Sequence, residues 1–368
     1  MIYLDHAATT PADPRVMEAM LECMREAWAN PSSPYGLAGE ARRRLRLARR
    51  TMADALNIPP EGIVFTSGGT EANSQALRLA EGGHAVVSAI EHASVIEAAR
   101  RWAGSVTLVP PGPDGVVRPE DIERAIRPDT KLVSVQFANN ETGVLQPVRA
   151  IADVAREHRV PFHCDAVQGF GQVPLDMAAL GIDLLSLSAH KFYGPRGAGC
   201  LAARGNVRPP CLIDGGGQEN GLRGGTEDLP AIWGMAEATR LAMEDMDERA
   251  ARLGELSRAF LDGVTSRVPG ARPLCPEAER LPGLMAFLLP GMNAERAIAG
   301  LDLLGVCVSG GAACASRAGA VSHVYRALGL SDADAACVIR VSLGRHTTRA
   351  EVAEAAEAVG KVCEGSRE

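Results

Sequence analysis

A lysine at the end of an apolar run is the first residue of this chain that could do chemistry. The stretch SLSAHKFYGPRG places Lys191 just before a Gly-Pro turn, at the tip of an expected strand. The earlier run HCDAVQG ends with Asp165, in a segment too apolar to leave a carboxylate without a partner. The pair is typical of a pyridoxal phosphate site, where a lysine binds the cofactor and an acid keeps its pyridine nitrogen protonated. The alternatives are a solvated strand end for Lys191 and a helix N-cap for Asp165.

A glycine-rich turn provides a place for an anion. In FTSGGTEAN a strand leads into Ser67-Gly68-Gly69-Thr70, and a helix begins near Glu71. Backbone N–H groups, a hydroxyl and the positive end of the helix would then face a phosphate group. The turn matches neither G-x-x-x-x-G-K-[ST] nor G-x-G-x-x-G, so the sequence does not favour a nucleoside triphosphate or a dinucleotide.

A thiol lies in a segment of small residues near the C-terminal end. Cys314 belongs to VSGGAACASRAGAVS, which has no apolar period long enough for a helix or strand. We therefore expect a loop whose thiol can act as a nucleophile. Cys307 is the competing thiol, but GVCVS reads as a buried strand, which favours an inert side chain there.

Composition and charge exclude several classes of protein. The 368 residues are 46% apolar and 23% charged, which is typical of a soluble globular chain with two or three domains. A net charge of -7 argues against a broad basic face for nucleic acid or anionic lipid. No signal peptide or membrane-spanning run is evident, so we expect a cytoplasmic protein. The nine scattered cysteines contain no C-x-x-C, which indicates neither a disulfide framework nor a resident metal.

The elements that would position these residues follow from the periodicity of apolar side chains. Between Asp13 and Leu56 the pattern predicts two helices, separated at NPSSPYGLAG. The arginine run of the second helix could bind nucleic acid, but we interpret it as the solvated face of an amphipathic helix. The buried stripe of that helix is expected to contain Leu45, Leu47, Ala48, Met52 and Leu56.

Further along, short apolar runs alternate with helical stretches. The runs are GIVFTS, HAVVSAI, SVTLVP, KLVSVQF, VPFHCDA, DLLSLSAHK and GAGCLAA, with helices such as Glu71 to Glu81 and Val148 to His158 between them. This predicts an α/β fold with a mainly parallel sheet between helices, whose ligands lie beyond the carboxyl ends of the strands. A helical stretch from Trp233 to Arg267 then leads into a smaller α+β unit.

Ten motifs together resemble a known family. YLDHAATTP, NPSS, FTSGGTEAN, EHASV, NNETGVLQP, DAVQ, SLSAHKFYGPRG, GGGQENGLRGGT, SGGAACAS and IRVSLGRHTT occur in the order found in cysteine desulfurases of the NifS/IscS group, from residue 3 to about 348. These enzymes belong to the class V aminotransferases and have the type I fold of pyridoxal phosphate enzymes. The resemblance implies a large cofactor-binding α/β domain at 14–255 and a small α+β domain, formed by 1–13 and 256–368, that carries the cysteine loop.

The resemblance also implies cofactor contacts. Lys191 matches the lysine that binds pyridoxal phosphate, Asp165 the partner of the pyridine nitrogen, and Gln168 that of the ring hydroxyl oxygen. His92 would lie over the ring and assist proton transfers. The phosphate contacts correspond to Gly69, Thr70, Ser188, His190 and, across a homodimer interface, Thr226.

Substrate contacts are implied in the same way. Asn140 and Arg340 match positions that orient the substrate, and Arg340 would bind its carboxylate. Without the family context, Asn140 could simply close a turn and Arg340 could be a surface charge.

The implied activity is conversion of L-cysteine to L-alanine, with a persulfide formed on Cys314 for transfer to an acceptor such as an iron-sulfur scaffold protein. Cys314 could also ligate an iron-sulfur cluster transiently. The alternatives are a selenocysteine lyase or another class V enzyme, or a sulfur-carrier or assembly protein with weak catalysis. A carrier would need none of the residues implied in catalysis, and their presence favours an enzyme: Lys191, Asp165, Gln168, His92 and Arg340.

Overall fold

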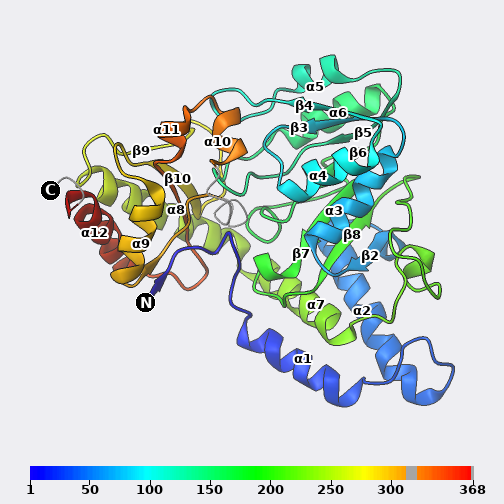
Figure 1. Cartoon of the computed structure of the whole chain (residues 1–368). Coiled ribbons are helices and arrows are strands. Elements are labelled where there is room, and N and C mark those ends of the chain that lie inside the picture. The colour runs from blue at the N-terminus through cyan, green and yellow to red at the C-terminus, as the bar shows by residue number, and fades with distance from the viewer. Residues whose placement is uncertain (312–320, 366–368) are drawn as a thin grey trace.

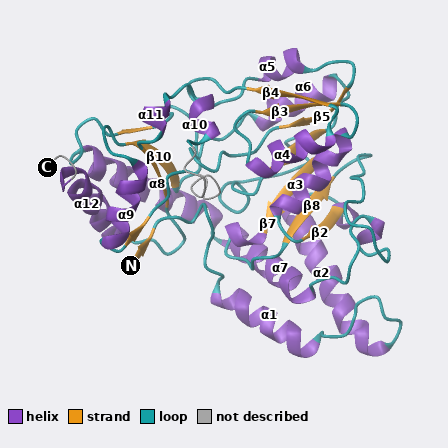
Figure 2. Cartoon of the chain, viewed as in Figure 1, coloured by secondary structure: helices purple, strands orange, loops and turns teal. Residues whose placement is uncertain are grey.

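Three sheets organise the chain. The computed structural model describes residues 1–311 and 321–365, and it places a seven-stranded sheet in one part and a three-stranded and a two-stranded sheet in the other (Figures 1 and 2). The order of the large sheet is β2-β8-β7-β6-β5-β3-β4, and β8 alone in it runs antiparallel to its neighbours. The mainly parallel sheet predicted from the apolar runs is therefore present.

The strands of the large sheet are β2 (Ile63–Thr66), β3 (His84–Ser88), β4 (Ser105–Val109), β5 (Thr130–Ser134), β6 (Phe162–Asp165), β7 (Leu184–Ser188) and β8 (Gly199–Ala203). The smaller sheets contain β1 (Ile2–Tyr3), β9 (Arg272–Pro273), β10 (Leu284–Leu288), β11 (Val306–Cys307) and β12 (Val338–Ser342). The α-helices of the described residues are α1 (Pro14–Glu26), α2 (Gly39–Leu56), α3 (Gly69–Leu77), α4 (Ala93–Trp102), α5 (Pro119–Ala125), α6 (Val148–Glu157), α7 (Leu229–Glu244), α8 (Met246–Thr265), α9 (Ala294–Leu303), α10 (His323–Ala327), α11 (Asp332–Ala335) and α12 (Arg349–Gly365).

Side chains that point alternately to the two faces of the large sheet form two hydrophobic cores, one on each face. In β3, Val86 belongs to the core shared with α2, α6 and α7, whereas Val87 belongs to the core shared with α3 and α4. Both residues are fully buried. Because neighbouring side chains of a strand point to opposite faces, a sheet covered on both sides needs continuous apolar strands, as the sequence has.

The first two helices form where the periodicity predicts them. Asp13 begins α1 because its carboxylate accepts the backbone N–H of Arg15 at 2.9 Å, with Pro14 in the first turn. Two details of α2 differ from the prediction. Leu47 is 38% exposed rather than buried, and Arg44, from the run interpreted as solvated, is 4% exposed and pairs with Glu40 at 2.7 Å.

The second unit has its own core. Helices α8, α9 and α12 pack against β10, β12, β1 and β11, on the left of Figure 1. Strand β1 pairs in parallel with β11, so the first residues of the chain lie in the same unit as the last helix. The boundary expected near residue 255 falls inside α8, whose Leu253 already belongs to this second core. The division of the chain at 255 stays a prediction.

Among the helices of the described residues, we found none long and apolar enough to cross a membrane. Seven cysteines of the described residues carry free thiols: Cys23, Cys164, Cys200, Cys211, Cys275, Cys307 and Cys337. These seven are buried or half-buried.

Candidate active site

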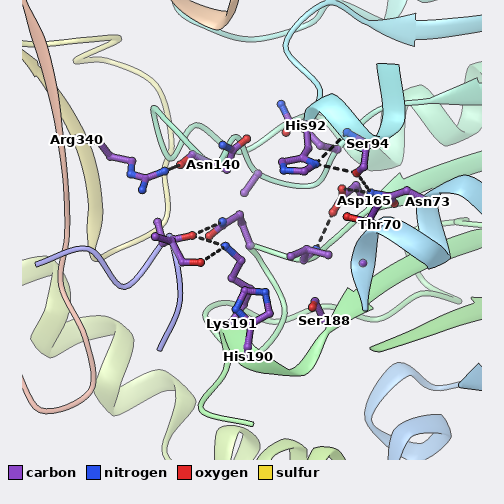
Figure 3. A pocket seen from close by; sticks show the side chains of 17 residues that line it. Thr70, Asn73, His92, Ser94, Asn140, Asp165, Ser188, His190, Lys191 and Arg340 are labelled. Carbon is purple, nitrogen blue, oxygen red and sulfur yellow. Dashed lines mark hydrogen bonds between the residues drawn. The ribbon is translucent and has the colours of Figure 1, made fainter. Parts of the chain in front are cut away.

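A cavity of about 270 Å³ lies where several strands of the large sheet end (Figure 3). Its walls come from the ends of β6 and β7, the start of α3, the start of α4, the N-terminal segment and β12 of the second unit. The cavity brings together these predicted residues: Gly69, Thr70, His92, Asn140, Asp165, Gln168, Ser188, His190, Lys191 and Arg340.

The start of α3 forms a cradle that an anion fits. Gly68 has a φ of +151°, and a Cβ on Gly69 would lie 2.8 Å from Cγ2 of Val167 and 3.5 Å from Cβ of Ser188. A side chain at Gly69 would therefore force the wall of the cavity to move. The positive end of α3 and the hydroxyls of Thr70 and Ser188 line the same space. This donor set fits the phosphate of pyridoxal phosphate.

Lys191 is held by the N-terminal segment. It ends the 3-10 turn Ala189–Lys191 directly after β7, and its Nζ donates to the carbonyl oxygens of Ala7 and, at 2.9 Å, Ala8. Gln168 also donates to the Ala7 carbonyl, at 3.0 Å. The residues between β1 and α1 thus fix two of the predicted cofactor contacts in the cavity wall.

His190 is a neutral side chain at physiological pH. Burial, with the charge of the neighbouring Lys191, lowers the pKa of His190 to about 4. Its Nδ1 lies 3.0 Å from the hydroxyl of Thr9. A ring nitrogen of His190 can therefore offer a phosphate a hydrogen bond.

Asp165, at the end of β6, is 7% exposed and has the partners that its apolar surroundings require. One oxygen accepts the backbone N–H of Val167 at 3.0 Å, and the other accepts the side-chain amide of Asn73 at 2.7 Å. Both donors are neutral. No positive group forms a direct hydrogen bond with this carboxylate among the described residues, so it fits the task of holding a proton on a pyridine nitrogen.

His92 caps α4 and faces the cavity. Its Nδ1 accepts the backbone N–H of Ser94 at 3.1 Å and lies 2.7 Å from the Ser94 hydroxyl. Burial lowers the pKa of His92. Asp165 opposes this shift, whereas Lys191 and His323 add to it.

Arg340, on β12, is buried rather than a surface charge, at 2% exposure. One Nη donates to the backbone carbonyl of Asn140 at 2.9 Å, and the other to a carboxylate oxygen of Asp5 at 2.6 Å. The neighbouring Asn139 is the residue that closes the turn, since its side-chain oxygen accepts the N–H groups of Glu141 and Thr142. Asn140 is therefore available to line the cavity.

Three residues of the cavity network were missed from the sequence. Asn73 lies one helical turn after Gly69 in FTSGGTEAN, so helical spacing could have placed it beside the phosphate cradle. Ser94 follows His92 in EHASV, but a serine at the start of a helix usually reads as a cap. Asp5 is separated from Arg340 by 335 positions, and no local pattern signals their contact.

Two predicted residues are not among those that line this cavity. Thr226 lines a separate cavity of about 230 Å³ together with Ser67, Gly197 and Arg223. Cys314 lies outside the described residues. Its competitor Cys307 lies on β11, where a buried strand was predicted, but its side chain is half-buried rather than buried.

The sheet, the phosphate cradle and the lysine at a strand end together define a class of protein. Residues 2–354 match the aminotransferase class-V family, and the chain belongs to that family. Within it, the chain is similar to the cysteine desulfurase IscS of Clostridium botulinum strain Kyoto, with 38% identity over all of this chain and 95% of the relative. The resemblance to the cysteine desulfurases of the NifS/IscS group is confirmed.

Solved structures agree with this assignment. A NifS-like protein from Rickettsia africae superposes with a TM-score of 0.92 and 32% identity, covering 99% of both chains. A structure titled SspA in complex with cysteine has a TM-score of 0.83 and 34% identity, covering 95% of this chain and all of the other. The type I fold expected from the resemblance is therefore the fold of this chain.

Proposed function

We propose that this protein is a pyridoxal phosphate-dependent cysteine desulfurase. The observation that carries the proposal is that one cavity holds Lys191 from the turn after β7, Asp165 from the end of β6 and Arg340 from the middle of β12. A lysine to bind the cofactor, an acid for its ring nitrogen and a cation for the substrate carboxylate are the three groups that such a reaction requires. Relatives named cysteine desulfurase IscS match along the whole chain, which supports the same activity.

Different side chains of the cavity would hold different parts of the cofactor. Lys191 would hold the cofactor, Thr70, Ser188 and His190 its phosphate, and Asp165 the proton on its ring nitrogen. Bound pyridoxal phosphate withdraws electrons from the substrate α-carbon. Gly69 and Gln168 would complete the cofactor contacts.

The sulfur step would use the thiol of Cys314. The Cys314 thiolate attacks the sulfur of L-cysteine, the carbon–sulfur bond breaks, and its electron pair takes a proton to give L-alanine. The balance is one thiol and one cysteine converted to one persulfide and one alanine. The acceptor of the persulfide sulfur, expected to be a scaffold protein for iron-sulfur clusters, stays a prediction.

The test of the proposed function is product analysis. We expect protein loaded with pyridoxal phosphate to release alanine and sulfide in equal amounts from L-cysteine in the presence of a reductant. Turnover of selenocysteine alone would identify a selenocysteine lyase. Exchange between an amino acid and a keto acid would identify an aminotransferase. Absorbance of a bound cofactor with no product from any substrate would favour a carrier or assembly protein.

Arg340 provides a prediction about substrate binding. The Arg340→Lys variant keeps the positive charge but loses the planar fork that binds Asp5, the Asn140 carbonyl and a carboxylate together. We expect the KM for cysteine to rise about thirtyfold, with a smaller change in kcat. Steady-state kinetics measures both. Arg345→Lys is the matched control, because Arg345 is also largely buried and pairs with Asp13, yet it is not among the residues that line the cavity.

We also propose that two copies of the chain form a homodimer. Thr226, expected to reach the phosphate of a partner subunit, lines a cavity of its own rather than this chain's cofactor cavity. Met17, Leu21 and Met24 form an exposed stripe on α1, and Trp28 beyond it is 69% exposed. Such apolar surface is typical of an interface. Sedimentation equilibrium should give twice the chain mass of 38.7 kDa; the monomer mass would contradict the dimer.

A further inference from the structure

A chain of hydrogen bonds runs along the wall of the cavity from Asp165 to His92. It passes through two side chains to which no role has been given so far, Asn73 and Ser94. Figure 3 shows the four side chains side by side, to the right of the cavity. They come from three elements, since Asp165 ends β6, Asn73 lies in α3, and His92 and Ser94 form the start of α4.

The direction of the first bonds follows from the chemistry of the groups. An ionised carboxylate only accepts hydrogen bonds, so the amide nitrogen of Asn73, not its oxygen, must face Asp165. That nitrogen donates to Asp165 at 2.7 Å and to the Ser94 hydroxyl oxygen at 2.9 Å. Asn73 is 1% exposed, so water does not compete for these two protons.

The direction of the remaining bonds then follows. The backbone N–H of Ser94 donates to Nδ1 of His92 at 3.1 Å, so Nδ1 carries no proton of its own. The Ser94 hydroxyl lies 2.7 Å from the same nitrogen, and its proton must therefore be directed to it. Two donors converge on Nδ1, which must present its lone pair.

We propose that Ser94 is a positioning residue that, together with Asn73, fixes His92 as the tautomer with its proton on Nε2. The opposite edge of the imidazole faces the cavity in Figure 3, so His92 presents an N–H donor there. To accept a proton, the imidazole would have to use Nδ1, but the lone pair of Nδ1 already accepts from the backbone N–H and the hydroxyl of Ser94. His92 therefore begins the reaction as a hydrogen-bond donor rather than as a base.

Burial, more than the surrounding charges, favours a neutral ring. The titratable groups that face His92 are Asp165 from β6, Lys191 from the turn after β7, and His323 from α10. Burial is the largest effect on the pKa of His92, and it lowers it. The role of His92 as a donor during the reaction rests on the proposed function, because that role requires a cofactor and a substrate in the cavity. The tautomer of His92 in the free protein does not depend on the proposed function.

The tautomer can be measured by NMR on the full chain labelled with ¹⁵N-histidine, with and without pyridoxal phosphate. We expect the His92 signals, assigned with His92→Gln, to show an unprotonated Nδ1 and a protonated Nε2 at neutral pH. In Ser94→Ala the lone pair loses its hydroxyl donor, and the pKa of His92 should rise by about one unit. Ser94→Thr, which keeps the hydroxyl, should restore the wild-type value. The alkaline shift should also appear in the pH profile of kcat.

Ser134→Ala is the matched control. The Ser134 hydroxyl lies 2.8 Å from Nδ1 of another buried histidine, His163, so this variant should change the His163 signals and leave those of His92 unchanged. A protonated Nδ1 on wild-type His92 would overturn the proposal without any variant. An unchanged His92 pKa in Ser94→Ala would overturn the role of Ser94. Neither result depends on sulfide release, so failure of the proposed function is detected separately.

Discussion

Lys191→Ala is expected to lower the rate of alanine formation from cysteine by about a thousandfold or more and to remove the absorbance of the bound cofactor. The reason is local. Lys191 lines the cavity, with its Nζ held beside the cavity by the carbonyl oxygens of Ala7 and Ala8. No other lysine lines the cavity among the described residues. Absorbance spectroscopy of the purified variant and a discontinuous alanine assay measure the two effects.

Lys131→Ala is the control for this experiment. Lys131 lies on β5, and its Nζ likewise donates to a backbone carbonyl, that of Glu81, at 2.7 Å. It is not among the residues that line the cavity, so its variant should keep both absorbance and turnover. A coloured, active Lys191→Ala protein would disprove the assignment of Lys191 and, with it, the proposed cofactor.

Much of the large sheet could be predicted because buried strands leave a strong local signal. Runs such as HAVVS and LLSLS became β3 and β7, and the cavity lies at strand ends, where the sequence analysis had looked for candidate residues. The reversed direction of β8 could not be predicted, because an apolar strand has the same composition in either direction. The periodicity of α2 likewise could not show that glutamates of α1 would surround Arg44 and allow it to be buried.

The site was predictable where motifs are local and not where contacts are distant. Lys191 and the phosphate turn are each contained in a few residues, and the cavity holds both. The contact of Asp5 with Arg340 joins the N-terminal segment to β12, and the sequence contains no signal for such a pairing. From the sequence, the Ser94 hydroxyl could be interpreted only as a helix cap. Its proposed positioning role depends on a hydrogen bond from Asn73 of α3, which no local pattern predicts.

Cys314→Ser is expected to remove sulfide and alanine production, by about a thousandfold, while leaving the cofactor absorbance unchanged. A serine hydroxyl is almost never ionised at neutral pH and cannot form a persulfide, so the substrate sulfur has no acceptor in the protein. The groups that would hold the cofactor line a cavity built from described residues that do not include Cys314. Cofactor binding should therefore survive the change. Full activity of this variant would contradict the proposed nucleophile.

Cys307→Ser is the matched control, because Cys307 is the other thiol near this part of the sequence and is only half-buried. If Cys307 carried the sulfur, its variant would lose turnover and Cys314→Ser would not. The two cysteine variants and Lys191→Ala then separate two halves of the reaction. Loss of absorbance together with turnover places a residue in cofactor binding, as expected for Lys191. Loss of turnover with absorbance retained places it in sulfur transfer, and only Cys314 is expected to behave in that way.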